Sequence, residues 1–268
     1  MINVTVLNTV GTSPMVASEM AEYLVRKFRG TNNRINKFTL IFTRDEEVVS
    51  GVKALIGALK SHYGWLKIEP LELSIKDVSK LDDFILLLEQ IRPAVVESKA
   101  NGDKIYFNLT GGRKLESMLI SSYSPLIGVD SIYNITNKQI RNINELYERN
   151  KDIIMSFKDI PLNSHEEFRE LSDFYSLHRE KLDPIFFPEF SDIDINELFV
   201  LHLPRDILAE IYMLIENDRI SRDDLEEIYR VPDYRLEAYR ESGLIIIDKG
   251  SCYRTDLGKA LSHYLKQI

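Results

Sequence analysis

The residues best suited to chemistry lie in the stretch FNLTGGRKLES, residues 107–117. A β-rich run stops there at Gly111 and Gly112, and the cations Arg113 and Lys114 open a helix-like segment. The first turn of a helix carries about half a positive elementary charge, so a cation there is unfavourable by a few tenths of a kcal/mol. The pattern therefore predicts an anionic partner for Arg113 and Lys114.

A second glycine loop, NTVGTSP at residues 8–14, also follows a strand-like run. In doubly wound sheets the first and fourth strands are commonly neighbours at the point where ligands bind. We therefore expect residues 11–13 and 110–114 to face each other across one cleft. Two helix N-termini, small hydroxyl residues and two cations at one place describe a phosphate site.

Familiar nucleotide and metal patterns do not fit these loops. Neither the GxGxxG nor the GxxxxGK[ST] spacing is present in them. The five histidines are scattered, without a histidine or acidic partner at ligand spacing. We therefore expect no metal and no cofactor.

Strand-like and helix-like runs alternate over the first 135 residues. The strand-like runs are 2–8, 37–43, 65–73, 104–110 and 131–136, and the helix-like runs are 14–29, 45–62, 79–97 and 113–122. The alternation predicts an α/β domain over residues 1–140, with a Rossmann-like, mostly parallel sheet. Right-handed crossovers then place every strand-to-helix loop on the carboxyl edge of the sheet.

Two further regions follow this domain. Residues 141–202 are acidic and rich in Phe and Pro, and we expect an irregular connector with a helix at 164–179. Residues 203–268 have the order of three helices, a β-hairpin and a last helix, which is typical of a winged helix-turn-helix domain.

The candidate DNA-contacting residues of this last domain are Tyr234, Arg235 and Arg240. Residues 203–268 carry 10 basic and 13 acidic residues, and 10 − 13 gives a net charge of −3. A DNA-binding surface must neutralise phosphates, so DNA binding is possible but not favoured.

Composition narrows the class of protein. The formal net charge is −8, which argues against general binding to nucleic acid or membranes, although residues 1–150 carry 19 basic and 17 acidic residues, 19 − 17 = +2. Cys252 is the only cysteine, no apolar run approaches the roughly 18 residues of a membrane span, and the N-terminus has no signal-peptide pattern. We expect a soluble cytoplasmic protein.

The GTSP loop, the TGGRK loop and the C-terminal winged-helix pattern together resemble the CARF proteins of type III CRISPR systems. The resemblance covers nearly the whole chain and implies a homodimer that binds cyclic oligoadenylate, foremost cyclic tetra-adenylate, across its two-fold axis. The chain is similar to ring nucleases of this kind, which cleave the ligand without metal through its own ribose 2′-hydroxyl and so switch the signal off. No Arg is followed five residues later by His, so the HEPN ribonuclease of other family members is not expected.

The resemblance also implies roles for residues of both loops. Ser13 would hold the phosphate or the 2′-hydroxyl in line, and Lys114 would stabilise charge on the scissile phosphate. The implied ligand-binding residues are Gly11, Thr12, Asn108, Thr110, Gly111, Gly112 and Arg113.

Simpler structural roles remain open for these residues. Ser13 can cap a helix with Pro14 as its first residue. Gly111 and Gly112 can form only a tight turn, and Arg113 can pair with a carboxylate. Thr12 and Thr110 can be turn residues, and Asn108 can satisfy backbone groups at the strand edge.

Three other cations, Arg44, Lys138 and Arg141, also follow strands, and we assign them to the solvated surface. Two other functions remain open. One is a cyclic-oligoadenylate-responsive winged-helix transcription regulator without enzymatic activity. The other is a binder of a linear nucleotide or another phosphate.

Overall fold

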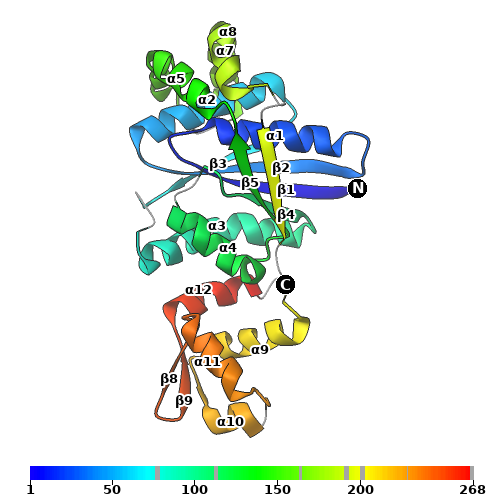
Figure 1. The fold of residues 1–268 in the computed structure, drawn as a ribbon, viewed down its shortest axis with the longest axis vertical. Helices are drawn as coiled ribbons and strands as arrows, with labels where there is room; N and C mark the ends of the chain where they lie inside the picture. The colour runs from blue at the N-terminus through cyan, green and yellow to red at the C-terminus, as the bar shows by residue number, and fades with distance from the viewer. Residues whose placement is uncertain are drawn as a thin grey trace.

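The computed structural model describes residues 1–75, 79–111, 114–162, 165–189, 193–199, 203–227 and 229–265. Figure 1 shows a layer of helices above a central sheet, a second pair of helices below it, and the C-terminal region beneath them.

The central sheet has six strands in the order β3-β2-β1-β4-β5-β6. They are β1 (Ile2–Val10), β2 (Asn33–Thr43), β3 (Ile68–Leu73), β4 (Lys104–Asn108), β5 (Ser131–Asn137) and β6 (Ile193–Phe199). The first five are parallel, and β6 pairs with β5 in antiparallel direction. The predicted Rossmann-like, mostly parallel sheet is confirmed. Because the chain winds outward in both directions from β1 and β4, the topological switch point lies between these two strands.

Helices cover both faces of the sheet. α1 (Met15–Phe28) and α2 (Glu46–His62) share one apolar core, and α3 (Leu81–Ala100) and α4 (Lys114–Ile127) contribute to a second core. The helices that follow β1 and β4 therefore leave the switch point on opposite faces. A ligand at the carboxyl edge would meet the first turns of both α1 and α4.

Residues 140–199 are more regular than the predicted connector. They form α5 (Ile140–Arg149), α6 (Lys151–Met155), a short 3-10 helix (Ser156–Asp159), α7 (His165–Leu177) and α8 (Arg179–Phe186), and then β6. These helices pack against α1 and α2, and their aromatic side chains Phe157, Tyr175 and Phe186 are completely buried. α7 corresponds to the helix predicted at 164–179. The other segments are short, so their helical periodicity is hard to recognise in the sequence, and the Phe-rich composition that suggested an irregular connector instead supplies a helical layer.

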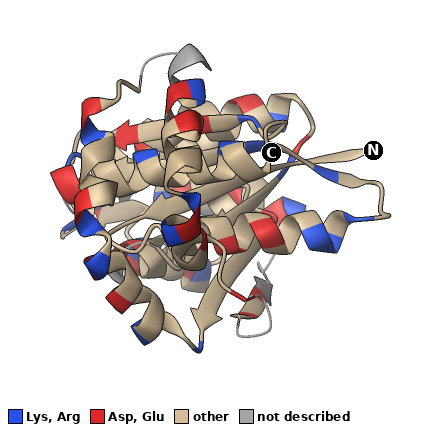
Figure 2. Cartoon of the chain, turned by 90° about the horizontal axis from the view of Figure 1, so that it is seen from above, with Lys and Arg blue, Asp and Glu red and all other residues tan. Residues whose placement is uncertain are grey.

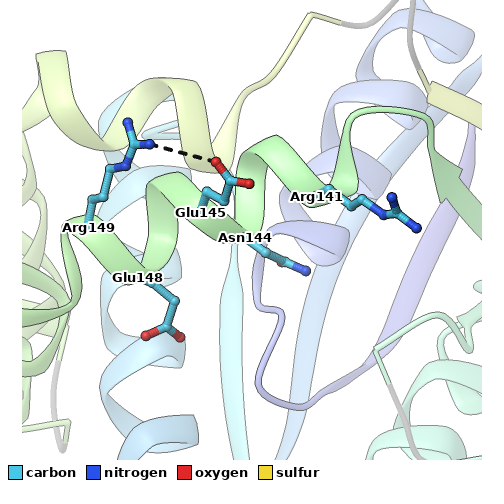
Figure 3. Close-up of a pocket in the computed structure, with 5 residues that line it drawn as sticks. All are labelled: Arg141, Asn144, Glu145, Glu148 and Arg149. Carbon is cyan, nitrogen blue, oxygen red and sulfur yellow. Dashed lines mark ion pairs between the residues drawn. The ribbon is translucent and has the colours of Figure 1, made fainter.

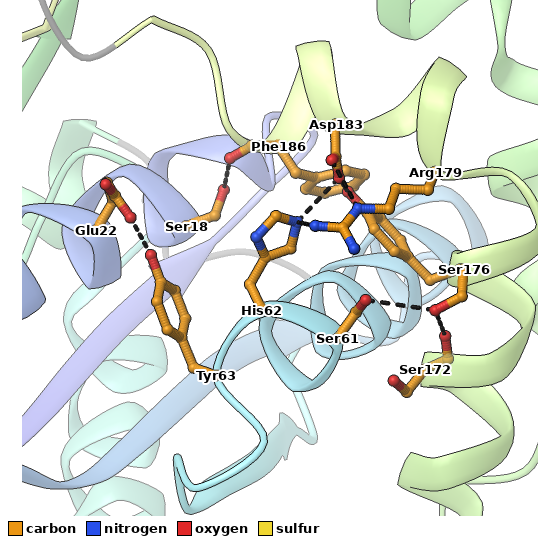
Figure 4. A network of polar contacts seen from close by, with 11 residues as sticks. Ser18, Glu22, Ser61, His62, Tyr63, Ser172, Ser176, Arg179, Asp183 and Phe186 are labelled. Atoms are coloured by element: carbon orange, nitrogen blue, oxygen red, sulfur yellow. Dashed lines mark hydrogen bonds and ion pairs between the residues drawn. The ribbon is translucent and has the colours of Figure 1, made fainter.

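A polar network attaches α7 and α8 to the end of α2 (Figure 4). Asp183 Oδ1 lies 3.0 Å from His62 Nε2 and accepts from the Tyr175 hydroxyl at 2.8 Å, while Arg179 Nε donates to Asp183 Oδ2 at 2.9 Å. Burial alone would raise the pKa of the Asp183 carboxyl, but these three partners hold it below its usual value. His62 is the last residue of α2, so the network lies at the end of that helix remote from the strand-to-helix loop.

The C-terminal region contains α9 (Arg205–Glu216), β7 (Arg219–Ser221), α10 (Arg222–Glu227), α11 (Asp233–Glu241), β8 (Ile245–Asp248), β9 (Ser251–Arg254) and α12 (Asp256–Leu265). Its three strands pair antiparallel in the order β7-β9-β8. The hairpin between β8 and β9 turns at Lys249 and Gly250, with φ of 45° and 72°. Two positive φ angles match the type I′ geometry that two-residue hairpins favour.

This region docks on the lower face of the sheet domain through α12, which packs against α3, α4 and α9 (Figure 1). The buried Tyr264 hydroxyl donates to the Leu88 carbonyl of α3. The Tyr123 hydroxyl of α4 donates to the Ser242 carbonyl at 2.7 Å. The apolar residues of both regions form one continuous core.

Candidate functional site

The loops after β1 and β4 are in direct backbone contact at the switch point. A Cβ atom added to Gly11 would lie 2.8 Å from the Gly111 carbonyl oxygen, and one added to Gly111 would lie 2.1 Å from the Thr9 carbonyl oxygen. Real Cβ atoms do not approach that closely. Gly11 and Gly111 are both described, and neither has a positive φ angle. Glycine is therefore needed at both positions because the two loop backbones approach closely, and not because of an unusual backbone conformation.

Two buried asparagines, one in β1 and one in β4, hold the loops in position. Asn8 and Asn108 are paired in register on β1 and β4, and both are completely buried. Asn108 Nδ2 donates to Asn8 Oδ1 and to the Val16 carbonyl, each at 3.2 Å, and Asn108 Oδ1 accepts from the Thr110 backbone N–H at 3.2 Å. Asn108, expected among the ligand contacts, therefore has its amide committed to holding the loop and the start of α1 together. Asn8 was not predicted, although it ends the strand-like run 2–8 as Asn108 lies near the end of the run 104–110.

Thr110 fixes the second loop to β5. Its hydroxyl oxygen accepts from the Ile135 backbone N–H at 2.6 Å. The loop is also held at its other end, since the Ser117 hydroxyl of α4 donates to the Leu109 carbonyl at 3.0 Å. The Thr110 hydroxyl proton can still be donated outward, because the side chain is only partly buried.

Ser13 does not cap α1. The N-cap residue is Pro14, which has a helical conformation and gives no side-chain hydrogen bond. The structure therefore does not support the simple capping role for Ser13. Ser13 is partly exposed, and its hydroxyl has no hydrogen-bond partner within the described ranges. Thr12 beside it is exposed. The first turn of α1 contains no acidic residue, so its positive end is not compensated by its own side chains.

The predicted cations are described only in part. Lys114 is the first residue of α4, as expected, and the described structure includes its backbone but not its side chain. Gly112 and Arg113 lie outside the described residues. α4 nevertheless begins three residues after Gly111 in the chain.

One buried acid of α1 was not anticipated from the sequence. Glu19 is 1% exposed, and its Oε1 accepts from Asn137 Nδ2 at 2.5 Å at the end of β5. Its Oε2 is buried without a hydrogen-bond partner in the described structure. Burial raises the pKa of Glu19 to about 7, although the Asn137 hydrogen bond lowers it. Val16, three residues earlier on the same side of α1, is the side chain nearest to Gly111.

The candidate DNA-contacting arginines of α11 are held in ion pairs. Arg235 Nη1 lies 2.6 Å from Glu210 Oε2 of α9, and Arg240 Nη2 lies 2.6 Å from Glu237 Oε2. Tyr234 is 69% exposed. The two candidate DNA-contacting arginines thus already have carboxylate partners.

Known proteins resemble the chain as follows. A family model described as CRISPR-associated protein NE0113 (Cas_NE0113) matches residues 14–165, which is more than half of the chain. Among solved structures, Enterococcus italicus Csm6 bound to cyclic hexa-2′-fluoro-hexa-dAMP aligns with TM-score 0.39 and 12% identity, over 81% of this chain and 46% of its own. Protein VC1899 from Vibrio cholerae aligns with TM-score 0.36 and 12% identity, over 99% of this chain and 66% of its own.

The chain thus spans about half the length of Csm6 and 66% of VC1899. No curated protein matches the sequence. In the part of the chain that the structure describes, none of the helices has the length and hydropathy to span a bilayer.

Proposed function

The chain belongs to the CRISPR-associated NE0113 family, and from that membership and the geometry at the switch point we propose that it binds cyclic oligoadenylate and cleaves it as a metal-independent ring nuclease. The observation that carries the proposal is the contact between Gly11 and Gly111. It brings together two helix N-termini, a serine hydroxyl without a partner in the described residues, and the backbone of Lys114. This set of groups suits a phosphodiester.

In the proposed reaction a ribose 2′-oxygen of the ligand attacks the adjacent phosphorus. The bond from phosphorus to the 5′-oxygen breaks, the 2′-hydroxyl loses its proton, the 5′-oxygen gains one, and a 2′,3′-cyclic phosphate remains. Ser13 donates to the phosphate and keeps the attack in line, and Lys114 and Arg113 balance the charge that builds on the phosphate oxygens. Asn108 acts indirectly, by holding the loop.

A homodimer is the assembly that we propose. A ring of four adenylates has approximate two-fold symmetry, and an isologous dimer presents each loop twice to it. Four such loops would surround cyclic tetra-adenylate with two copies of Ser13 and Lys114. In this assembly cleavage would switch off a type III CRISPR signal.

The test is incubation with labelled cyclic tetra-adenylate in EDTA, followed by separation of cyclic and linear products. Lys114→Ala should lower the single-turnover rate about 100-fold or more, since loss of one preorganised donor commonly has that effect. Ser13→Ala should slow cleavage more than it weakens binding. Lys104→Ala, at the opposite end of β4, is the matched control and should cleave like the wild type. Intact ligand after long incubation with excess wild-type protein would exclude the nuclease.

A second function is favoured by the docking of the C-terminal region. We propose that residues 203–268 form a winged helix, and α4 connects it directly to the glycine loops through the Tyr123–Ser242 hydrogen bond. Ligand binding at the start of α4 would then shift this region, as in a ligand-responsive regulator. Because both arginines of α11 are held in ion pairs with carboxylates, binding of a protein partner or a role as an internal lid is favoured over DNA binding. Equal affinity for a specific promoter fragment and random DNA, with or without ligand, would exclude the transcription regulator.

A further inference from the structure

Among the described cations that follow strands at the carboxyl edge of the sheet, Arg141 differs from Arg44 and Lys138 in having no carboxylate partner. Arg44 Nε lies 2.7 Å from Glu72 Oε1, and Lys138 Nζ lies 3.3 Å from Asp194 Oδ2. Arg141, the third cation that follows a strand, is exposed and makes no ion pair or hydrogen bond with any described residue. Seen from above the helices that cover the sheet (Figure 2), basic and acidic residues are interspersed, so an unpaired arginine is a local feature rather than part of a basic surface.

Arg141 lines a hollow of about 520 Å³ on α5 together with Asn144, Glu145, Glu148 and Arg149 (Figure 3). At the other end of this hollow each charged side chain has a partner of opposite charge. Arg149 Nη2 lies 3.7 Å from Glu145 Oε2, and Lys151 Nζ lies 3.7 Å from Glu148 Oε2. Arg141 and Asn144 occupy the end nearest the sheet. The Asn144 amide also has no partner among the described residues.

α5 and the loop that carries Ser13 both approach Gly51 of α2. The Pro14 ring and the Tyr147 hydroxyl each lie 3.2 Å from the position of a Cβ added at Gly51. Tyr147 belongs to α5, and Pro14 directly follows Ser13. The strand that leads into α5 is bonded to the second loop through Ile135 and Thr110. Each glycine loop is therefore linked to α5 through one neighbouring element, α2 or β5.

We propose that Arg141 and Asn144 form a nucleotide subsite beside the glycine loops, in which one adenylate unit of the ligand is bound by its phosphate and its base edge. One guanidinium group can donate hydrogen bonds to two phosphate oxygens at once, and an asparagine amide can form two hydrogen bonds with N6 and N7 of adenine. Side chains three residues apart on a helix are neighbours, so both can reach one nucleotide. The subsite deepens the proposed function and rests on it.

The test is a titration of fluorescent cyclic tetra-adenylate with the full chain at several salt concentrations. Arg141→Ala should weaken binding about tenfold, the usual effect of losing one charged hydrogen bond, and should reduce the slope of log affinity against log salt, because one charge contact is lost. Arg149→Ala is the matched control, because it lies on the same helix and in the same hollow but is paired with Glu145. It should bind like the wild type.

Asn144→Ala separates base recognition from charge. The wild type should prefer cyclic oligoadenylate to the corresponding oligoinosinate, which lacks the 6-amino group, and Asn144→Ala should lose this preference without changing the salt slope. In cleavage assays Arg141→Ala should raise KM and leave the rate at saturating ligand unchanged, as expected for a binding residue.

The outcomes distinguish the subsite from the function on which it rests. Tight wild-type binding that Arg141→Ala leaves unchanged, or that Arg149→Ala weakens equally, overturns the subsite and leaves the proposed function standing. If the wild type binds none of the cyclic oligoadenylates, the proposed function and the subsite both fall. Because all three side chains are exposed, circular dichroism should show wild-type folding in each variant.

Discussion

Glu19 carries a carboxyl group into the interior beside the candidate site. Only one of its oxygens is hydrogen-bonded, to Asn137, and the other is buried without a partner in the described structure. Ionising such a group is unfavourable because water is excluded, which is why burial raises its pKa from 4.5 to about 7. Glu19 is therefore an acid that changes charge near neutral pH. It lies one helical turn from Val16, the side chain nearest to Gly111.

This pKa predicts a pH-dependent stability. The Glu19 carboxyl binds its proton more tightly in the folded state than in the unfolded state. Protonated Glu19 therefore contributes fully to the free energy of unfolding below pH 4.5, and this contribution is lost as the pH rises through about 7. Glu19→Gln removes the titration. Compared with the wild type, it should be on the order of 3 kcal/mol more stable at pH 8 and nearly equal at pH 4.5, as measured by urea unfolding. Parallel pH profiles for the two proteins would contradict the assignment.

At the level of elements, the site is built by the contact between two loops rather than by either loop alone. The Asn8–Asn108 pair fixes the strands in register, and the glycines allow the loops to touch above it. A methyl group at Gly111 has no room, because the Thr9 carbonyl and the Val16 side chain occupy its position.

Gly111→Ala should therefore separate the loops. We expect a loss of about 1–3 kcal/mol in unfolding free energy, typical of overpacking in a dense interior, together with loss of ligand binding. Gly64→Ala is the control, since its added Cβ would lie 3.6 Å from the nearest atom, the Lys60 carbonyl oxygen. It should change stability by no more than about 0.5 kcal/mol. Full ligand affinity in Gly111→Ala would show that the loop contact is not needed for binding.

These elements differ in how well the sequence predicts them. The parallel sheet and the two glycine loops were predictable, because alternating strand and helix periodicities and glycine positions are local signals. Of the helical layer of residues 140–186, only α7 was predicted, as the helix at 164–179; the other helices and the edge strand β6 were not, because their short segments are recognisable only through what they pack against. The Arg235–Glu210 pair joins α11 to α9, and no spacing rule reveals it. The Arg240–Glu237 pair is different, because residues three apart on one helix are neighbours and the sequence could have predicted their contact.

At the scale of the whole molecule, the second apolar core joins the sheet domain to the C-terminal region. α12 places Leu261 and Tyr264 against α3 and α4, and both side chains are almost completely buried. If the two regions unfold as one cooperative unit, the shared core gives a ligand at the start of α4 a cooperative route to the C-terminal region.

Leu261→Ala tests this unity. Removing a completely buried leucine should lower the unfolding free energy by about 3 kcal/mol through lost burial and an unfilled cavity. Trp65, the single tryptophan, lies in the sheet domain and reports its unfolding by fluorescence, while hydrogen exchange reports the amides of residues 203–265. If the regions are one unit, both probes should shift to lower urea together. An unchanged Trp65 transition with early exchange in residues 203–265 would mean that the C-terminal region unfolds separately. Ligand binding at the glycine loops would then have no cooperative route to it.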